Sequence, residues 1–230
     1  MEYIFSGFKE AVLIIFSLNP EFLYIVWTSI KVSILALLLA VIVGVPVGIF
    51  VGLVKFRGRD FVAVVLNTLM SMPTVVIGLL VYAMISRRGP LGGVGLLYTV
   101  TAMVIGQAIL AFPIVAALVA AAVRNHEDKA LRLARVLGAS PFDAYLTYIS
   151  EARFSIFAAV IAGFGRVFSE IGISMMLGGN IRFYTRNITT AIALETAKGR
   201  FGIGIALGMV LLAVAFILNT GFHCFQKRSV

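Results

Sequence analysis

Several residue types on which protein chemistry depends are scarce in this sequence. It has a single cysteine, Cys224, which excludes an intramolecular disulfide and fits no metal-binding spacing. The two histidines, His126 and His223, are far apart, and each is isolated from any nucleophile. No Gly-x-x-x-x-Gly-Lys-Ser/Thr phosphate-binding loop is present. The sequence therefore predicts neither an enzyme nor a metal or cofactor site, and any ATP hydrolysis that powers this protein must occur on another chain.

Charge is scarce as well. Only 13% of the 230 residues are charged, 61% are hydrophobic, and the mean hydropathy is +1.06. The charged residues gather between long apolar runs, which is typical of a protein that crosses a membrane several times. The net charge of +9 does not indicate nucleic-acid binding, because the basic residues flank these runs and form no single stripe. We therefore expect the lipid bilayer, and not a nucleic acid, as a partner.

The apolar runs predict an all-α fold, a polytopic transmembrane helical bundle with about five spans. The expected spans cover residues 24–54, 61–86, 96–123, 154–177 and 201–225. Glycines in the second half of the first span permit close helix packing. A short helix is also expected over residues 185–198, at the outer surface.

The N-terminal apolar run, residues 4–18, is shorter than a span. Its fifteen residues would reach about 22 Å as a helix, whereas the hydrocarbon core is about 30 Å thick. We expect an interfacial helix within an N-terminal segment of residues 1–23, ahead of a transmembrane domain of residues 24–230. A short sixth span is the alternative. The topology that we expect has the N-terminus outside and the C-terminus in the cytoplasm, together with the basic loop after residue 54.

The longest stretch that carries polar residues is 124–150, between the third and fourth spans. Asn125 can cap the start of a short helix, and Gly138 can end it, because glycine accepts a left-handed conformation. Ser140 and Pro141 then suit the N-cap and first position of a second helix, with an acid at the third position. The sequence predicts a helix, a sharp turn and a second helix. The alternative is an ordinary loop between two spans.

Three motifs in this chain resemble those of a transporter family. Residues 124–150 resemble the cytoplasmic coupling loop of ABC importer permeases, with Arg132-Leu133 in place of the Glu-Ala of the family pattern. Residues 164–172 resemble the Arg-x-x-Ser-Glu-Phe-Gly signature of oxyanion permeases. Residues 178–196 are similar to the tungstate-specific branch of that family.

The resemblance implies the membrane-spanning subunit of a type I ABC importer in the cytoplasmic (inner) membrane, for tungstate or molybdate. It implies cytoplasmic ATP-binding subunits and an extracytoplasmic oxyanion-binding protein as partners. We also expect a homodimer, because five spans are too few to enclose a guarded pathway. The residues that it assigns to ATPase coupling are Arg132, Leu133, Ala134, Gly138, Ala139, Ser140, Pro141 and Phe142. An ion-coupled carrier or channel that needs no ATPase is the alternative.

Arg166 and Glu170 are charged residues inside the fourth apolar span, where unpaired charges are costly. They are four residues apart, so they would lie on one helix face. One interpretation is an ion pair that neutralises itself; the other is a pore or gate that includes Ser169. Since the carboxylate would repel a dianion, we expect anion selectivity to come from a separate binding protein.

A basic set is expected at the outer surface: Arg182, Arg186, Lys198 and Arg200, with Glu195 as the only nearby acid. These cations could face lipid headgroups, or they could form an entry funnel that raises the local concentration of an oxyanion. In the second interpretation the funnel also includes the neutral side chains of Asn180, Thr185, Thr189 and Thr190.

Overall fold

The computed structural model describes the backbone of residues 11–17, 19–136 and 140–227. Helices dominate these residues, and no strand occurs among them. Residues 11–16 form a short helix. The elements that follow are α2 (Pro20–Leu53), α3 (Arg59–Met70), α4 (Thr74–Ile85), the 3-10 turn η1 (Gly92–Val94), α5 (Val100–Val136), α6 (Pro141–Phe168), α7 (Gly172–Gly178), α8 (Ile188–Ala197) and α9 (Phe201–Lys227). The all-α prediction is confirmed.

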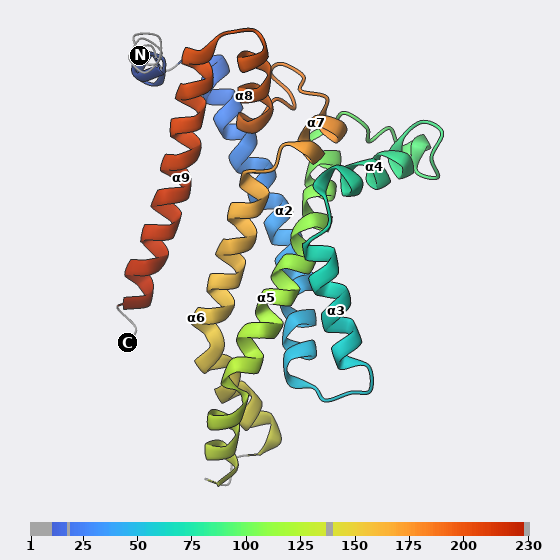
Figure 1. Ribbon diagram of the computed structural model, residues 1–230, viewed down its shortest axis with the longest axis vertical. Helices are drawn as coiled ribbons and strands as arrows, with labels where there is room; N and C mark the ends of the chain where they lie inside the picture. Colours follow the sequence, from blue (N-terminus) through green and yellow to red (C-terminus); the bar gives the residue numbers. More distant parts are fainter. Residues whose placement is uncertain (1–10, 18, 137–139, 228–230) are drawn as a thin grey trace.

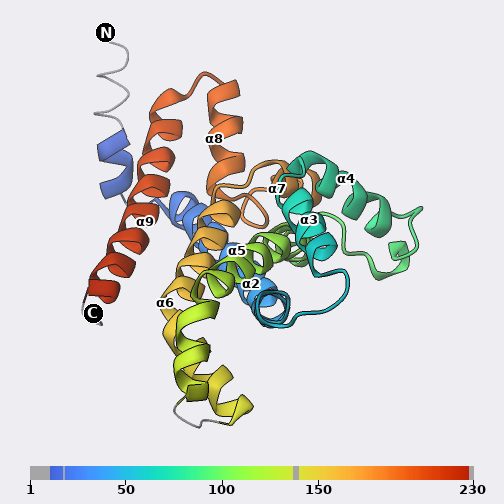
Figure 2. The same ribbon diagram turned by 60° about the horizontal axis from the view of Figure 1, so that its bottom comes forward.

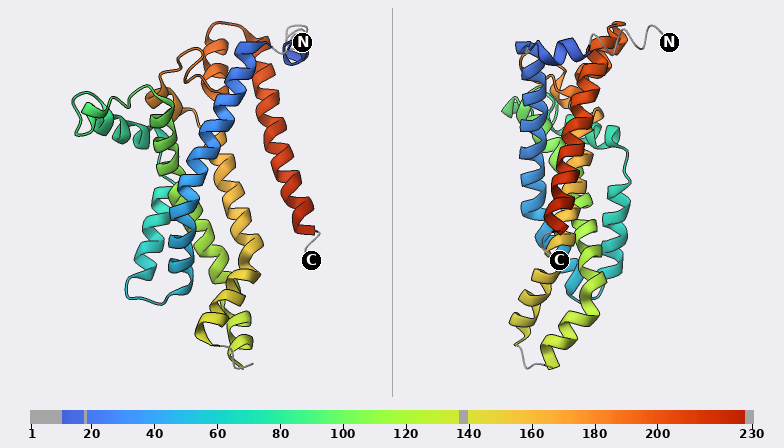
Figure 3. Two further views of the ribbon diagram at one scale, coloured as in Figure 1. Left: turned by 180° about the vertical axis from the view of Figure 1, so that it is seen from behind. Right: turned by 90° about the vertical axis from the view of Figure 1, so that its left-hand side faces the viewer.

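The long helices α2, α5 and α6 form the centre of the bundle, with α2 packed on α5 and α5 packed on α6 (Figure 1). The hairpin between α5 and α6 projects beyond the rest of the bundle at its lower end, as Figure 2 also shows. The loop between α2 and α3 lies toward the same end. At the opposite end lie α8, the start of α9 and the short helix 11–16 (Figure 3). One end of the bundle therefore consists of the α5–α6 hairpin and the α2–α3 loop, and the other end of α8, the start of α9 and the helix 11–16.

Three helices are long and apolar enough to cross a membrane, namely Pro20–Leu53, Val100–Arg124 and Phe201–Gly221. Two further candidate spans are bent pairs, by 93° between α3 and α4 and by 57° between α6 and α7. Five spans result if each bent pair counts as one. The segments expected as spans over residues 61–86 and 154–177 are each interrupted by a bend. The first breaks at Ser71–Pro73, where proline has no backbone N–H to continue a helix.

The helix predicted to begin at Asn125 is not a separate element. Helix α5 runs without interruption from the third span to Val136. Residues 124–136 are rich in Ala, Leu, Arg and Lys, which favour the continuation of an existing helix more than the cap at Asn125 favours a new one. The second helix begins as predicted: Ser140 Oγ accepts a hydrogen bond from Asp143 N at 3.2 Å, and Pro141 is the first helical residue. Gly138, the expected helix stop, lies outside the described residues.

Close packing between α2 and α5 depends on three glycines of α2 spaced four residues apart. A Cβ atom added at Gly48 would lie 2.7 Å from the backbone oxygen of Ala116, and one at Gly52 would lie 2.6 Å from Val123 Cγ1. Gly44 faces Val115 in the same way, at 3.2 Å. The predicted close approach of the first span to another helix is therefore confirmed, and it brings the two backbones together in the half nearer the hairpin.

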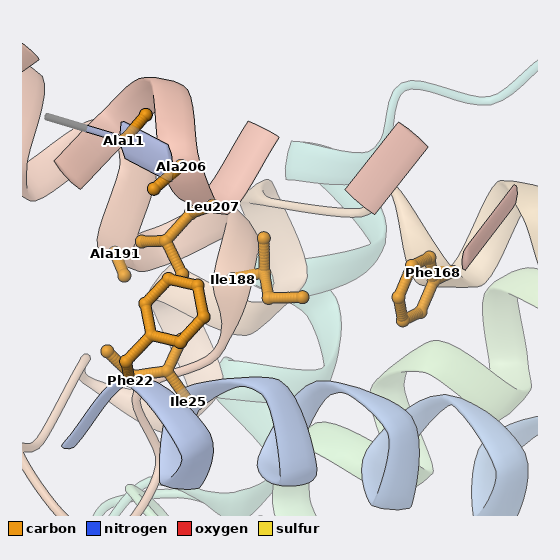
Figure 4. Close-up of a cluster of buried hydrophobic side chains, with 8 residues drawn as sticks. All are labelled: Ala11, Phe22, Ile25, Phe168, Ile188, Ala191, Ala206 and Leu207. Carbon is orange, nitrogen blue, oxygen red and sulfur yellow. The ribbon is translucent and has the colours of Figure 1, made fainter. Parts of the chain in front are cut away.

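The opposite end of the bundle has its own apolar cluster, which joins five segments of the chain (Figure 4). Its buried members are Ala11, Phe22, Ile25, Phe168, Ile188, Ala191, Ala206 and Leu207. The short helix expected over residues 185–198 is confirmed as α8, and this cluster packs it between α2 and α9. The interfacial position expected for the N-terminal segment stays a prediction, although Ala11 belongs to this cluster.

We predict opposite effects of the same substitution at two helical glycines. Gly48→Ala should lower the melting temperature of the purified protein by several degrees, because the new methyl group meets a backbone oxygen that cannot move aside, an overpacking that costs about 1–3 kcal/mol. Gly208→Ala in α9 meets nothing within 4 Å. It should raise the melting temperature slightly, since alanine is the better helix former. Equal shifts at both positions would contradict the packing of α2 on α5.

Candidate functional site

The most strongly connected charged group of the structure lies at the break between α6 and α7. The sequence analysis expected Arg166 and Glu170 on one helix face. Helix α6 ends at Phe168, so Glu170 lies beyond the helix that carries Arg166. The ion pair nevertheless forms, with 2.7 Å between Arg166 Nη1 and Glu170 Oε2. The two partners differ in exposure: Glu170 is 3% exposed, whereas the Arg166 side chain is 40% exposed.

Glu170 binds more than its ion-pair partner. Its Oε1 accepts a hydrogen bond from Ile173 N at 3.2 Å, which satisfies a backbone donor at the start of α7. Its backbone oxygen accepts hydrogen bonds from Thr189 Oγ1 at 2.8 Å and Ser174 Oγ at 3.2 Å. A buried carboxylate is tolerated only when it has such partners. Glu170 is therefore the joint at which α6, α7 and α8 meet.

Ser169 and the partly exposed Arg166 lie beside each other on an open side of α6. Ser169 is exposed, and its hydroxyl lies 3.0 Å from the backbone oxygen of Gly165, to which it donates. Ala162 and Gly165, one turn earlier, are exposed as well. This side of α6 therefore presents small side chains and one guanidinium group. Their role as a pore or gate stays a prediction.

A buried amide lies next to this joint, on the first turns of α5. Gln107 is 1% exposed, and its Nε2 donates a hydrogen bond to Ser174 Oγ at 2.9 Å. The same oxygen accepts a hydrogen bond from Asn187 Nδ2 at 3.0 Å. Sequence reasoning missed this contact, because 67 residues separate Gln107 from Ser174 and no local pattern relates them.

At the end of the bundle opposite the hairpin, two of the predicted basic residues share one carboxylate. Arg182 Nη2 lies 2.6 Å from Glu21 Oε2, and Arg186 Nη1 lies 3.0 Å from Glu21 Oε1. The expectation that Glu195 is the only nearby acid is therefore wrong. Glu21 begins α2, 161 residues before Arg182, and only the fold brings them together. The hydrogen bond to Glu21 raises the pKa of Arg182, which therefore stays protonated.

Glu195 binds the other two predicted cations, with 3.0 Å to Lys198 Nζ and 3.6 Å to Arg200 Nη1. The two groups line one pocket of about 360 Å³, which we call the outer cleft. Its charged residues are Glu21, Arg182, Arg186, Glu195, Lys198 and Arg200. Four cations face two carboxylates, so the outer cleft has an excess of two positive charges.

The neutral residues predicted for an anion funnel have structural roles instead. Thr185, Thr189 and Thr190 are buried. Thr185 Oγ1 donates to the backbone oxygen of Gly178, and Thr190 Oγ1 completes the N-terminal cap of α8. Asn180 is partly buried and accepts a hydrogen bond from Arg186 Nε at 3.2 Å. In this structure the threonine hydroxyls are buried and bonded within the protein, and the funnel stays a prediction.

Among the residues that the resemblance assigned to ATPase coupling, those that the structure describes lie where α5 ends and α6 begins. Arg132, Leu133 and Ala134 belong to the end of α5, while Ser140 caps α6 and Pro141 and Phe142 begin it. Gly138 and Ala139 lie outside the described residues. Coupling to an ATPase stays a prediction for all of them. Among the described residues, no group of His, Cys, Asp and Glu side chains could hold a metal ion.

Comparison with known proteins gives a consistent result. Residues 44–229 match the family described as the binding-protein-dependent transport system inner membrane component. The tungstate uptake system permease protein TupB of Campylobacter jejuni is 44% identical, over 99% of this chain and 95% of that protein. TupB of Peptoclostridium acidaminophilum is 40% identical, over 99% of this chain and all of that protein. The molybdenum transport system permease protein ModB of Escherichia coli K12 is 27% identical, over 86% of this chain and 93% of that protein.

We predict that Arg166 and Glu170 are energetically coupled. Arg166→Ala leaves Glu170 buried without its countercharge, and Glu170→Ala also removes the bond to Ile173 N, so each should lower the melting temperature. The double variant should lose less than the sum of the single variants, with a coupling of about 0.5–3 kcal/mol. Glu170→Gln is the matched control, because it retains an oxygen for Ile173 N. Strictly additive losses in a thermal unfolding series would contradict the pair.

Proposed function

Because this chain belongs to the family of binding-protein-dependent transport system inner membrane components, we propose that it imports tungstate, or the similar molybdate, as the membrane-spanning subunit of an ABC transporter. The similarity to two tungstate uptake permeases over almost their whole length supports tungstate first. The lower identity to ModB supports molybdate as the second candidate. ATP hydrolysis then occurs on separate cytoplasmic subunits.

The single observation that best supports ATP-driven movement is the α5–α6 hairpin. Both helices run without a break from the bundle into this hairpin, which projects beyond every other described element at its end (Figure 1). A force applied to the tip would therefore reach the membrane part through two stiff helices packed on each other. We infer that an ATP-binding subunit holds this tip, which includes the residues that resemble a coupling loop.

The orientation follows from the two ends of the bundle. On the side of the hairpin, the α2–α3 loop carries Lys55 and Arg57, and Arg59 begins α3 (Figure 1). Arg124 lies near the start of α3, with 4.0 Å between its Nη2 and Asp60 Oδ1. Basic loops favour the cytoplasmic side. We therefore infer that the hairpin end faces the cytoplasm and that the outer cleft, at the opposite end, faces the binding protein. The N-terminus would then lie outside, as the sequence analysis predicts.

A homodimer would complete the pathway. The exposed side of α6 and its C-cap carries the small, weakly polar residues Ala162, Gly165 and Ser169. Such a surface suits the lining of an anion pathway better than contact with lipid. Two such sides facing each other would enclose a channel between the protomers. Arg166 contributes little net charge there, because Glu170 neutralises it at 2.7 Å. A dianion could thus pass without being held tightly, and selectivity would come from the binding protein.

The test of this function is reconstitution. The permease, its ATP-binding chain and a tungstate-binding protein are placed in liposomes, and tungstate uptake is measured with and without ATP. Uptake that requires ATP and all three proteins is expected. Uptake by the permease alone, driven by an ion gradient, would instead identify an ion-coupled carrier.

We predict that Phe142→Asp combined with Gly138→Val abolishes assembly with the ATP-binding chain but leaves membrane insertion intact. A charge at the start of α6 would remove the apolar anchor that the resemblance assigns to Phe142, and valine would oppose a tight turn at residue 138. Co-purification and membrane fractionation measure the two properties. Asp143→Asn, a nearby change that keeps the hairpin, is the matched control. Normal co-purification by the double variant would remove the coupling assignment.

We predict that the outer cleft affects the rate of uptake and not its selectivity. A dianion gains about 2 kcal/mol for each close cation in water-like surroundings, and salt at 0.15 M screens this attraction beyond about 8 Å. Arg182→Gln with Arg186→Gln should therefore slow uptake at low salt. Glu21→Gln, which removes their shared carboxylate, should accelerate it. The differences should shrink at high salt.

The preference for tungstate over sulfate should be the same in the wild type, the double arginine variant and Glu21→Gln, because the binding protein sets this preference. A changed preference would show that these arginines contact the substrate selectively. If the variants and the wild type take up tungstate at the same rate at both salt concentrations, Arg182 and Arg186 do not attract the anion and instead contact lipid headgroups.

A further inference from the structure

Gln107 presents a polar group in the membrane part of α5 whose bonding is incomplete. Its side chain is 1% exposed, and its Nε2 donates to Ser174 Oγ at 2.9 Å. Its Oε1 is buried and has no hydrogen-bond partner among the residues that the structure describes. An unpaired buried oxygen of this kind costs about 1–3 kcal/mol. Such a group is uncommon inside a membrane protein unless it serves a function.

Exchanging the oxygen and nitrogen of the Gln107 amide does not remove the problem. Ser174 Oγ has one proton and two lone pairs, and it already accepts from Asn187 Nδ2 at 3.0 Å and donates to the Glu170 backbone oxygen at 3.2 Å. If Gln107 were turned over, its oxygen could accept the Ser174 proton only if the Glu170 backbone oxygen lost that hydrogen bond. The exchange would therefore cost a bond that the structure shows.

The unpaired oxygen of Gln107 lies where a movement of the hairpin helices would change the contacts of α5 with α7 and α8. Gln107 is on α5, while Ser174 is on α7 and Asn187 caps α8. Helix α7 follows the Glu170 joint at the end of α6, and α5 and α6 meet in the hairpin. A displacement at the hairpin tip would therefore move Gln107 relative to Ser174 and Asn187. Both amides already bond the same serine oxygen, so the Asn187 NH₂ group is a donor that a displacement could bring to Gln107 Oε1.

We propose that Gln107 is a positioning residue for transport, which bonds to Ser174 in the state described here and directly to Asn187 in the alternate state of the cycle. In each state one atom of the Gln107 amide is bonded and the other is not, Oε1 unpaired in the first and Nε2 in the second, so the energies of the two states stay close. The exchange also links the hairpin helices to α8, the helix that lies next to the outer cleft. The inference rests on the proposed ATP-driven function and specifies how the outer end follows the hairpin.

The experiment uses the complete reconstituted transporter and compares Gln107→Met with wild type. Methionine has a similar length and removes both the bond to Ser174 and the unpaired oxygen, so the melting temperature should change by less than about 3 °C. Tungstate uptake should nevertheless fall by about fivefold or more, the range of a typical coupling free energy. ATP hydrolysis should continue, so that more ATP is consumed for each anion transported.

Two further variants separate positioning from simple packing. Thr28→Val, at a buried position of α2 outside this set of bonds, is the matched control and should retain the wild-type ratio of ATP to tungstate. Gln107→Glu should restore much of the uptake, because burial would keep its carboxyl group protonated, with one donor and one acceptor.

The outcomes distinguish the two proposals. A Gln107→Met protein that transports with the wild-type ratio of ATP to tungstate would overturn the inference alone. A large decrease in the melting temperature of Gln107→Met with an unchanged ratio of ATP to tungstate would also overturn it, because the bond to Ser174 would then serve only stability. A wild-type transporter without ATP-driven uptake would overturn the proposed function, and the inference with it.

Discussion

A carboxylate can lie within a hydrocarbon layer only if every one of its oxygens has a partner, and this constraint governs the structure around Glu170. Its two carboxylate oxygens bind Arg166 and the start of α7, and its backbone oxygen binds Thr189 and Ser174. These bonds hold α6, α7 and α8 in a fixed relation across a break in the helix. The bend of 57° between α6 and α7 is therefore a stable feature and not a local irregularity.

The joint divides the chain into two parts with different interactions. On the hairpin side, long helices pack mainly through glycine and aliphatic side chains, as Gly48 and Val119 do. On the other side, short helices and turns are held by hydrogen bonds and by ion pairs such as Glu21 with Arg186, in addition to the apolar cluster around Ile188. Close apolar packing joins long helices into one body without fixing individual bond angles, whereas directional bonds require a defined geometry. The importer that we propose would use both properties in one chain.

Local sequence patterns predicted the features that depend on neighbours in the chain. The cap at Ser140, the proline after it and the pairing of Arg166 with Glu170 all act within four residues. The patterns failed where distant segments decide the outcome. No helix begins at Asn125, because α5 continues through this position to Val136. Glu21 pairs with Arg182, although 161 residues separate them in the sequence. Buried threonines such as Thr189 looked like surface donors, because composition alone does not reveal what covers a side chain.

The three glycines of α2 have a consequence for the surrounding membrane. Because Gly44, Gly48 and Gly52 bring α2 against the backbone of α5, the two helices must move as one body. The outer surface of that body carries exposed apolar side chains such as Ile42 and Val43, which suit contact with acyl chains. In a bilayer, a movement of α5 would therefore displace lipid, and the viscosity and lateral pressure of the membrane would resist the transport cycle that we propose.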